Sequence, residues 1–202
     1  MKQLLLLTLS IVLLRVPGFA APCTTGTLAS YIALGSAGCV LGNLQAADFS
    51  YQAKAGGGAA EITADQITVT PLLAPTGTVG LQFAAPWSVE AGQSEGSNIG
   101  YRLLSPAAPI QVQQIRLDGN GFKAGLIGSI VVRENLASPI TTATIDAYLK
   151  CDEVCTSQTS AEATVPPSAQ LVVLDVATLQ SKQGTAAMTS FDDWFVVCAA
   201  FA

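Results

Sequence analysis

The sequence predicts an all-β fold, an antiparallel β-sandwich of the jelly-roll or immunoglobulin-like kind. Three observations lead to this prediction. Apolar and polar residues alternate with period two in several segments, turn signals rich in glycine and proline separate these segments, and helical periodicity is scarce. Such alternation is typical of strands with one buried face and one face in water. Many short strands separated by turns favour a sandwich over a parallel sheet covered by helices.

The alternation is clearest in four segments rich in β-branched or aromatic residues, which are 49–54, 67–70, 99–103 and 144–150. A further strand, beginning at Ile110, keeps period two only if one residue of the Gln113-Gln114 doublet is skipped. This pattern predicts a β-bulge, because a bulge inserts one extra residue into one strand. The segment 192–202 is consistent with a final buried strand. Eight residues at 27–34 fit a short helix or a strand equally well.

Glycine and proline clusters predict where these strands end. They lie at 56–58, 75–77, 92–94, 106–109, 118–121, 138–139 and 166–167. The segment 118–121, Asp-Gly-Asn-Gly, offers oxygen atoms that calcium accepts as ligands. An EF-hand loop would continue with further acidic residues, whereas here Phe122, Lys123 and Ala124 follow. We therefore interpret 118–121 as a hairpin turn.

Residues 1–20 have the three-part layout of a secretory signal peptide. Lys2 is followed by an apolar run, and small residues at Gly18 and Ala20 precede a cut before Ala21. The apolar run is too short to span a bilayer. We expect residues 21–202 to form one β-sandwich domain that is secreted to the extracellular space or the periplasm. No stable membrane insertion is expected after cleavage.

Composition excludes several classes of function. The chain has no histidine, which removes Ser-His-Asp and Cys-His catalysis and histidine-ligated metals. Once Lys2 and Arg15 leave with the signal peptide, seven basic and fourteen acidic residues remain, for a net charge of −7. Nucleic acids are therefore not expected as partners, since they bind to basic patches.

Five cysteines in an exported chain predict disulfides. Two bridges and one free thiol allow fifteen pairing patterns, between which the sequence does not decide. We favour Cys23–Cys39, which would fasten the new N-terminus, and a local bridge between Cys151 and Cys155. Cys198, in an apolar run, is then a buried free thiol. A zinc site built on Cys151 and Cys155 is the weaker alternative, because no second close pair exists.

Two further groups of residues are candidates for chemistry. The neighbouring acids Asp152-Glu153 and Asp192-Asp193 face opposite sides of a strand, so neither pair forms an acid/base dyad, and we expect them to be solvated. Six aromatic residues are candidates for stacking on sugars, with core packing favoured for the set, and they are Trp87, Trp194, Tyr31, Tyr51, Tyr101 and Tyr148. Tyr148 is the best candidate, because alternation places it opposite the apolar stripe of its strand. We expect no catalytic residue, metal site or cofactor.

The N-terminal part also resembles a known family. The residues that carry the resemblance are Cys-Thr-Thr-Gly-Thr-Leu-Ala-Ser-Tyr from Cys23, Gly-Cys-Val-Leu-Gly from Gly38 and Phe-Ser-Tyr from Phe49, with weaker pieces up to about residue 135. This pattern is similar to a family of exported bacterial proteins of unknown activity, many of which carry a PEP-CTERM sorting tail. The resemblance implies a single secreted β-sandwich and supports the Cys23–Cys39 bridge. The tail motif does not follow Phe201 here, so we expect release rather than anchoring.

These observations give three hypotheses for function. The first is a non-enzymatic exported protein that takes part in surface, matrix or adhesive interactions, with an extracellular polysaccharide or a surface protein as partner. The second is a carbohydrate-binding module, for which an exposed row of aromatic side chains would be the signature. The third is a hydrolase that uses two carboxylates, which would require close acidic residues in a cleft.

Overall fold

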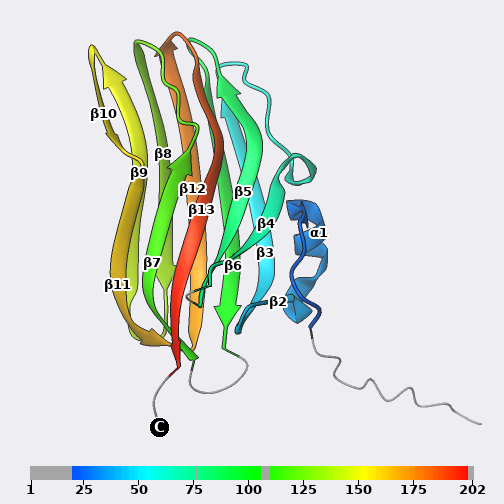
Figure 1. Cartoon of the computed structure of the whole chain (residues 1–202). Coiled ribbons are helices and arrows are strands. Elements are labelled where there is room, and N and C mark those ends of the chain that lie inside the picture. Colours follow the sequence, from blue (N-terminus) through cyan, green and yellow to red (C-terminus); the bar gives the residue numbers. More distant parts are fainter. Residues whose placement is uncertain (1–19, 76, 106–109, 200–202) are drawn as a thin grey trace, which may run out of the picture.

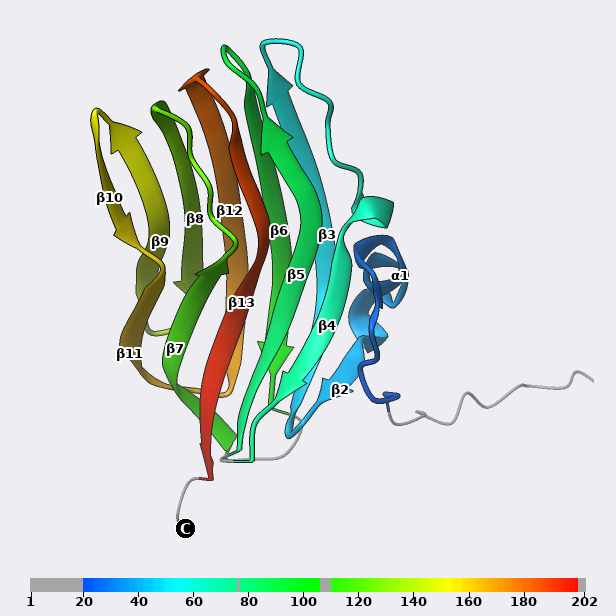
Figure 2. The same ribbon diagram turned by 45° about the horizontal axis from the view of Figure 1, so that its top comes forward.

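The computed structural model describes residues 20–75, 77–105 and 110–199. Two antiparallel sheets pack face to face as a sandwich (Figure 1), which confirms the predicted fold class. Turning the molecule shows the same two layers, with α1 lying beside one edge of the sandwich (Figure 2). The predicted signal peptide falls almost wholly on residues 1–19, which lie outside the described residues. Among the described residues, no helix is long and apolar enough to cross a membrane.

One sheet has six strands and the other has seven. The six-stranded sheet has the order β1 (Gly26–Thr27), β4 (Thr68–Leu73), β5 (Thr78–Val89), β13 (Ala186–Ala199), β7 (Ile110–Asn120) and β11 (Ser160–Ser168). The seven-stranded sheet has the order β10 (Val154–Gln158), β9 (Thr142–Asp152), β8 (Ile127–Ala137), β12 (Gln170–Gln183), β6 (Ser94–Leu104), β3 (Leu44–Gly56) and β2 (Cys39–Leu41). The helical elements are α1 (Leu28–Ala33) and two 3₁₀ turns, Gly35–Ala37 and Ala64–Gln66.

Inward-facing residues of both sheets form one core. Its largest fully buried side chains include Trp87, Tyr101, Phe83, Phe191 and Phe195. The ring of Phe83 contacts that of Phe191 within the six-stranded sheet, with centroids 5.2 Å apart. It contacts that of Tyr101 across the sandwich, with centroids 5.9 Å apart. Alternation thus directs one residue in two to the core, as the sequence predicts.

Two local features, the bulge in β7 and the helix α1, agree with what the sequence allows. In β7, Val196 pairs with Gln114 and Val197 with Val112, so Gln113 is the extra residue of a bulge, as predicted. The segment that allowed either a helix or a strand forms α1. The Thr27 hydroxyl accepts a hydrogen bond from the Ser30 N–H, which caps the first turn of this helix.

Two predicted turns are strands instead. Residues 118–120 belong to β7, and β7 and β8 lie in different sheets, so the chain crosses the sandwich here without forming a hairpin. Asp118 accepts a hydrogen bond from Ser160 and forms an ion pair with Arg116. The prolines at 166–167 lie inside β11, where the ladder to β7 is interrupted between Thr164 and Ser168. The predicted turn at 106–109 lies outside the described residues.

Both favoured disulfides are present. Cys23–Cys39 and Cys151–Cys155 are bonded, with sequence separations of 16 and 4. The first joins the described N-terminal segment to β2, and the second closes the turn between β9 and β10. Cys198 is the fifth cysteine, and the surroundings of its side chain lie outside what the structure describes.

Candidate functional site

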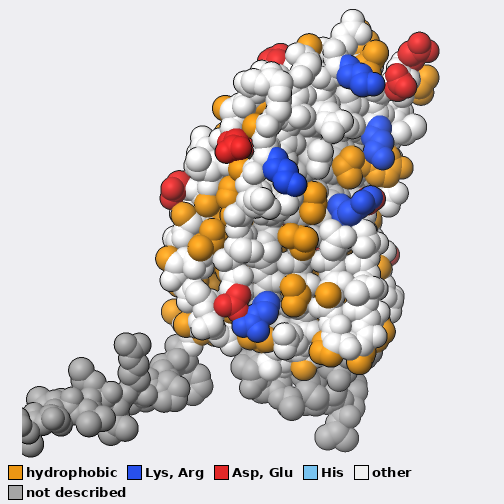
Figure 3. All heavy atoms as spheres, turned by 180° about the vertical axis from the view of Figure 1, so that it is seen from behind, with side chains coloured by type: hydrophobic (Ala, Val, Ile, Leu, Met, Phe, Trp, Pro, Cys, Tyr) orange, Lys and Arg blue, Asp and Glu red, His pale blue; other side chains and the backbone are white. Residues whose placement is uncertain are grey.

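The outer face of the seven-stranded sheet is rich in cationic side chains (Figure 3). Five of the seven basic residues that follow the predicted signal peptide lie at outward positions of its strands, and they are Lys54, Arg102, Arg133, Lys150 and Lys182. We call this surface the basic face. Three of the fourteen acidic residues, Asp48, Asp146 and Asp152, lie at outward positions of the same strands, so cations outnumber anions there although the whole chain is negative.

The two arginines of the basic face are neutralised, but the three lysines are not. Arg102 pairs with Asp48. The Nε and Nη2 atoms of Arg133 donate to the two carboxylate oxygens of Asp146 at 2.7 and 2.8 Å, which lowers the pKa of that carboxyl. Within the described parts of the chain, no carboxylate lies within ion-pair distance of the three lysines. None of the three is held in an ion pair, although the charge of Lys150 also acts on Asp146 and helps to lower its pKa.

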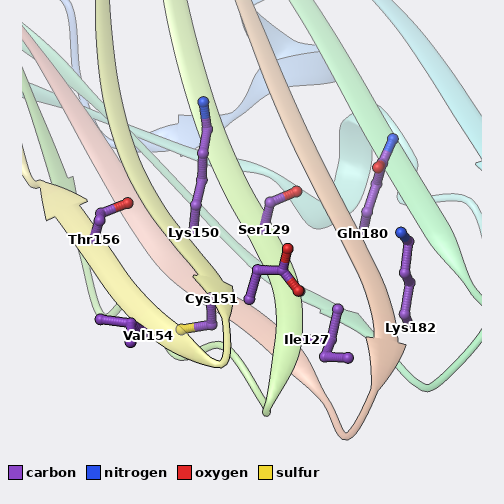
Figure 4. A pocket seen from close by; sticks show the side chains of 10 residues that line it. Ile127, Ser129, Lys150, Cys151, Val154, Thr156, Gln180 and Lys182 are labelled. Carbon is purple, nitrogen blue, oxygen red and sulfur yellow. The ribbon is translucent and has the colours of Figure 1, made fainter.

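A pocket of about 460 Å³ lies at one end of the basic face. Lys150, Ser129, Gln180 and Lys182 line it from three neighbouring strands, β9, β8 and β12 (Figure 4). The disulfide at Cys151 adjoins it and restrains the β9–β10 turn. One exposed carboxylate, that of Asp152, also lines the pocket, which leaves an excess of one positive charge there.

The strand register aligns polar groups in a row through this pocket. Successive cross-strand partners on β10, β9, β8, β12 and β6 are Thr156, Lys150, Ser129, Gln180 and Ser94. Because neighbouring strands lie about 4.8 Å apart, the row is about 19 Å long. Hydroxyl, amide and ammonium groups at such spacing can hydrogen-bond to successive units of an extended polar chain. Lys54 stands near the far end of this row, in a second hollow that Gln180 also lines.

The aromatic residues do not form a stacking platform. Trp87 and Tyr101 are fully buried, and Tyr31 is nearly so. The Tyr51 hydroxyl donates to the Ile62 carbonyl from the inward side of its strand. Trp194 lies on the outer face of the other sheet, beneath the Arg116 guanidinium. Tyr148 does face outward on the basic face, but the Lys150 ammonium lies over its ring, 4.8 Å from the centroid.

The acidic pairs divide into solvated and buried groups. Asp152 and Glu153 are exposed, as expected. Asp192 is half-buried on the outer side of β13 and accepts a hydrogen bond from Gln82. Asp193 is completely buried, so the expectation that it is solvated was wrong. The physical reason is alternation itself, because Asp193 occupies an inward position between Phe191 and Phe195.

Asp193 belongs to a cluster of three buried carboxyl groups, which we call the acidic triad. Its other members are Glu134 on β8 and Asp175 on β12, which are direct cross-strand partners. One carboxylate oxygen from each residue lies within 4.8 Å of the others. The Tyr101 hydroxyl donates to Oδ2 of Asp193 at 2.7 Å. All three side chains have no exposed surface, so a substrate cannot reach them as a hydrolase would require.

The pKa values of all three groups are raised, chiefly by burial. For Glu134 the negative charge of Asp193 adds to the effect of burial, and for Asp175 the charges of Asp193 and Glu134 do so. Burial raises the pKa of Asp193 to about 7, although hydrogen bonds from Asp175 and Tyr101 lower it in part. The core therefore disfavours three free negative charges at this position.

Sequence reasoning missed Glu134 and Asp175. A signal was present, because Glu134 interrupts the inward stripe between Val132 and Leu136. Asp175 interrupts the stripe between Val173 and Ala177 in the same way. An acid at an inward position of an otherwise apolar stripe is informative, since buried charged residues need a partner.

Glu95, a separate buried acid, gives a prediction for pH dependence. Burial raises its pKa to about 7, although the backbone groups of Ser88 and Ile62 lower it in part. The folded state therefore keeps this proton to a higher pH than the unfolded chain, so stability falls as pH rises from about 4.5 to about 7. Glu95→Gln removes the effect. Its free energy of unfolding relative to wild type should rise by about 2 kcal/mol between about pH 5 and pH 8.

Urea unfolding at a series of pH values measures this difference. Asp65→Asn, which removes an exposed acid, serves as the matched control. A constant difference between Glu95→Gln and wild type across the range would show that Glu95 is ionised in the folded protein.

Comparison with known proteins identifies no family. No protein-family model matches the chain, and no curated protein does. Among solved structures, the chain is similar to a crystal structure of the enzymatically active domain of tailspike protein 4 from bacteriophage CBA120. The identity is 13%, the match covers 73% of this chain and 19% of that one, and the TM-score is 0.33. The chain thus matches less than a fifth of that protein's length, and a likeness this distant carries no conclusion about activity.

Proposed function

We propose that this protein is an exported, non-enzymatic binding module that attaches to an acidic polysaccharide of a cell surface or matrix. The ligand lies across the basic face, with its carboxylate or sulfate groups near the three unpaired lysines. The observation that carries the proposal is the concentration of cationic side chains on one face of an acidic protein. Export is part of the proposal and is supported by the two disulfides.

The chemistry of the pocket suits a polyanion with hydroxyl groups. The lysines Lys150 and Lys182 supply charge, while Ser129 and Gln180 supply hydrogen bonds to sugar hydroxyls. Strands hold these groups on a rigid surface, which reduces the ordering cost of binding. Electrostatic attraction across an open surface is screened by salt, so the interaction should weaken as ionic strength rises.

The alternative hypotheses have less support. A module for neutral sugars would use exposed aromatic faces, but the ring of Tyr148 is covered by Lys150. A carboxylate hydrolase would place its acids in a cleft, whereas the acidic triad is enclosed in the core. The basic face is the feature of the described surface that fits a ligand of defined chemistry.

The double variant Lys150→Ala/Lys182→Ala tests the proposal. Each lysine near a polyanionic surface contributes about 1 kcal/mol, so binding to polygalacturonate should weaken about 30-fold. Affinity is measured by isothermal titration calorimetry or co-sedimentation with the polysaccharide. Binding by wild type should fall steeply with added salt, and neutral dextran should not bind.

A matched control removes two charges from elsewhere. Arg116 and Lys123 lie outside the basic face, so Arg116→Ala/Lys123→Ala should keep most of the affinity. Circular dichroism verifies that both double variants are folded. Equal loss in the two double variants would show that net charge alone is responsible. No binding by wild type to polygalacturonate, heparin or alginate would refute the proposal.

A further inference from the structure

If all three groups of the acidic triad are ionised, no cationic side chain of the described residues balances their negative charges. With all three groups ionised, five of the six carboxylate oxygens accept no hydrogen bond, and each of these five atoms is buried. The sixth accepts the Tyr101 hydroxyl. No described lysine or arginine lies within 4 Å of the three carboxylates. An unpaired buried charge is costly, so the site must contain protons or a cation.

The three carboxylates converge from both sheets. Glu134 and Asp175 project from neighbouring strands of the seven-stranded sheet, and Asp193 projects toward them from β13 of the opposite sheet. Two oxygens on opposite sides of a calcium ion lie up to about 5 Å apart, given bonds of 2.3–2.6 Å. One oxygen from each of the three carboxylates lies within 4.8 Å of the other two, which fits this separation. Glu134 is fully buried and neither of its carboxylate oxygens has a hydrogen-bond partner, which is the sign that a ligand belongs here.

The donor atoms identify the kind of cation. The three carboxylates supply oxygen alone, which suits hard cations and disfavours zinc or copper. Magnesium keeps several waters, for which a site enclosed among core side chains is poorly suited. Calcium accepts carboxylates as monodentate or bidentate ligands in flexible geometry, so three acids with one converging oxygen each suit it. We propose that Glu134, Asp175 and Asp193 bind one calcium ion between the two sheets.

Metal content and refolding test the proposal. The disulfide-bonded protein is purified after secretion, dialysed against metal-free buffer and analysed by plasma mass spectrometry, with about one calcium per chain expected. Because the site is enclosed, the protein is then unfolded in guanidinium chloride and refolded with calcium chloride or with EDTA. The thermal midpoint should rise by about 3–5 °C for each tenfold increase in free calcium above Kd.

Amide variants locate the effect. Glu134→Gln and Asp175→Asn preserve side-chain volume but remove a charged ligand, so both should abolish the calcium-dependent rise. Glu95→Gln changes a buried acid outside the triad and should retain it. If the amide variants do not fold, the metal content and refolding of wild type still decide between bound calcium and shared protons. Substoichiometric metal with equal midpoints in calcium and EDTA would overturn the proposal in favour of shared protons, and stoichiometric magnesium or manganese would overturn the assignment to calcium.

Discussion

Replacing Phe191 with alanine is expected to lower the free energy of unfolding by about 3–5 kcal/mol, the largest effect of any single substitution considered. The ring is fully buried near the middle of the sandwich. Its centroid lies 5.2 Å from that of Phe83 and 5.8 Å from that of Trp87. Truncation removes these contacts and leaves a cavity that the rigid sheets close only in part. Urea unfolding followed by tryptophan fluorescence measures the loss.

Phe122→Ala is the matched control, because the same atoms are removed from a half-buried ring at the edge of the core. Its expected cost is about 1–2 kcal/mol, since less apolar area is withdrawn from water there. Circular dichroism at low urea concentration ensures that both variants retain the sheet structure. Equal costs for the two variants would mean that the aromatic core relaxes around the missing ring, contrary to the close packing described above.

The fold was predictable because its signals are local. Residues 144–150 alternate strictly, and they form β9 with the expected residues facing inward. The Gln113 bulge was also visible, since one extra residue changes the phase of the alternation. The segment 118–121 was misread because glycine favours a turn regardless of which sheet the next strand joins. Only the tertiary structure shows that β7 continues through Asp118 and that β8 lies in the opposite sheet.

The sites were less predictable because they depend on register between distant strands. Lys150 and Gln180 lie on either side of Ser129, because β9 and β12 both pair with β8. No local sequence pattern encodes these pairings. Glu134 and Asp175 are 41 positions apart and meet through one cross-strand pairing. Their partner Asp193 comes from the other sheet. The composition suggested an acidic, solvated surface, whereas the structure places cations on one face and buries four of the acids.

Removing the Cys23–Cys39 disulfide is expected to destabilise the protein by about 3 kcal/mol. Cross-linking lowers the entropy of the unfolded chain, and the effect grows with the length of the closed loop. The sequence separation here is 16. The bridge also holds the chain where Cys23 N–H donates to the Val40 carbonyl, 2.9 Å away, beside the buried Tyr31 of α1. The variant Cys23→Ser/Cys39→Ser is compared with wild type by urea unfolding without reductant.

The second disulfide provides the matched control within the same chain. Cys151 and Cys155 close a loop of separation 4, for which the same entropic relation gives about 2 kcal/mol. Wild type denatured without reductant should show one thiol per chain, and each double variant should show the same one, which belongs to Cys198. Three thiols in wild type would mean that one of the bridges does not form. A larger loss for Cys151→Ser/Cys155→Ser than for Cys23→Ser/Cys39→Ser would show that restraint of the β9–β10 turn, and not loop length, dominates.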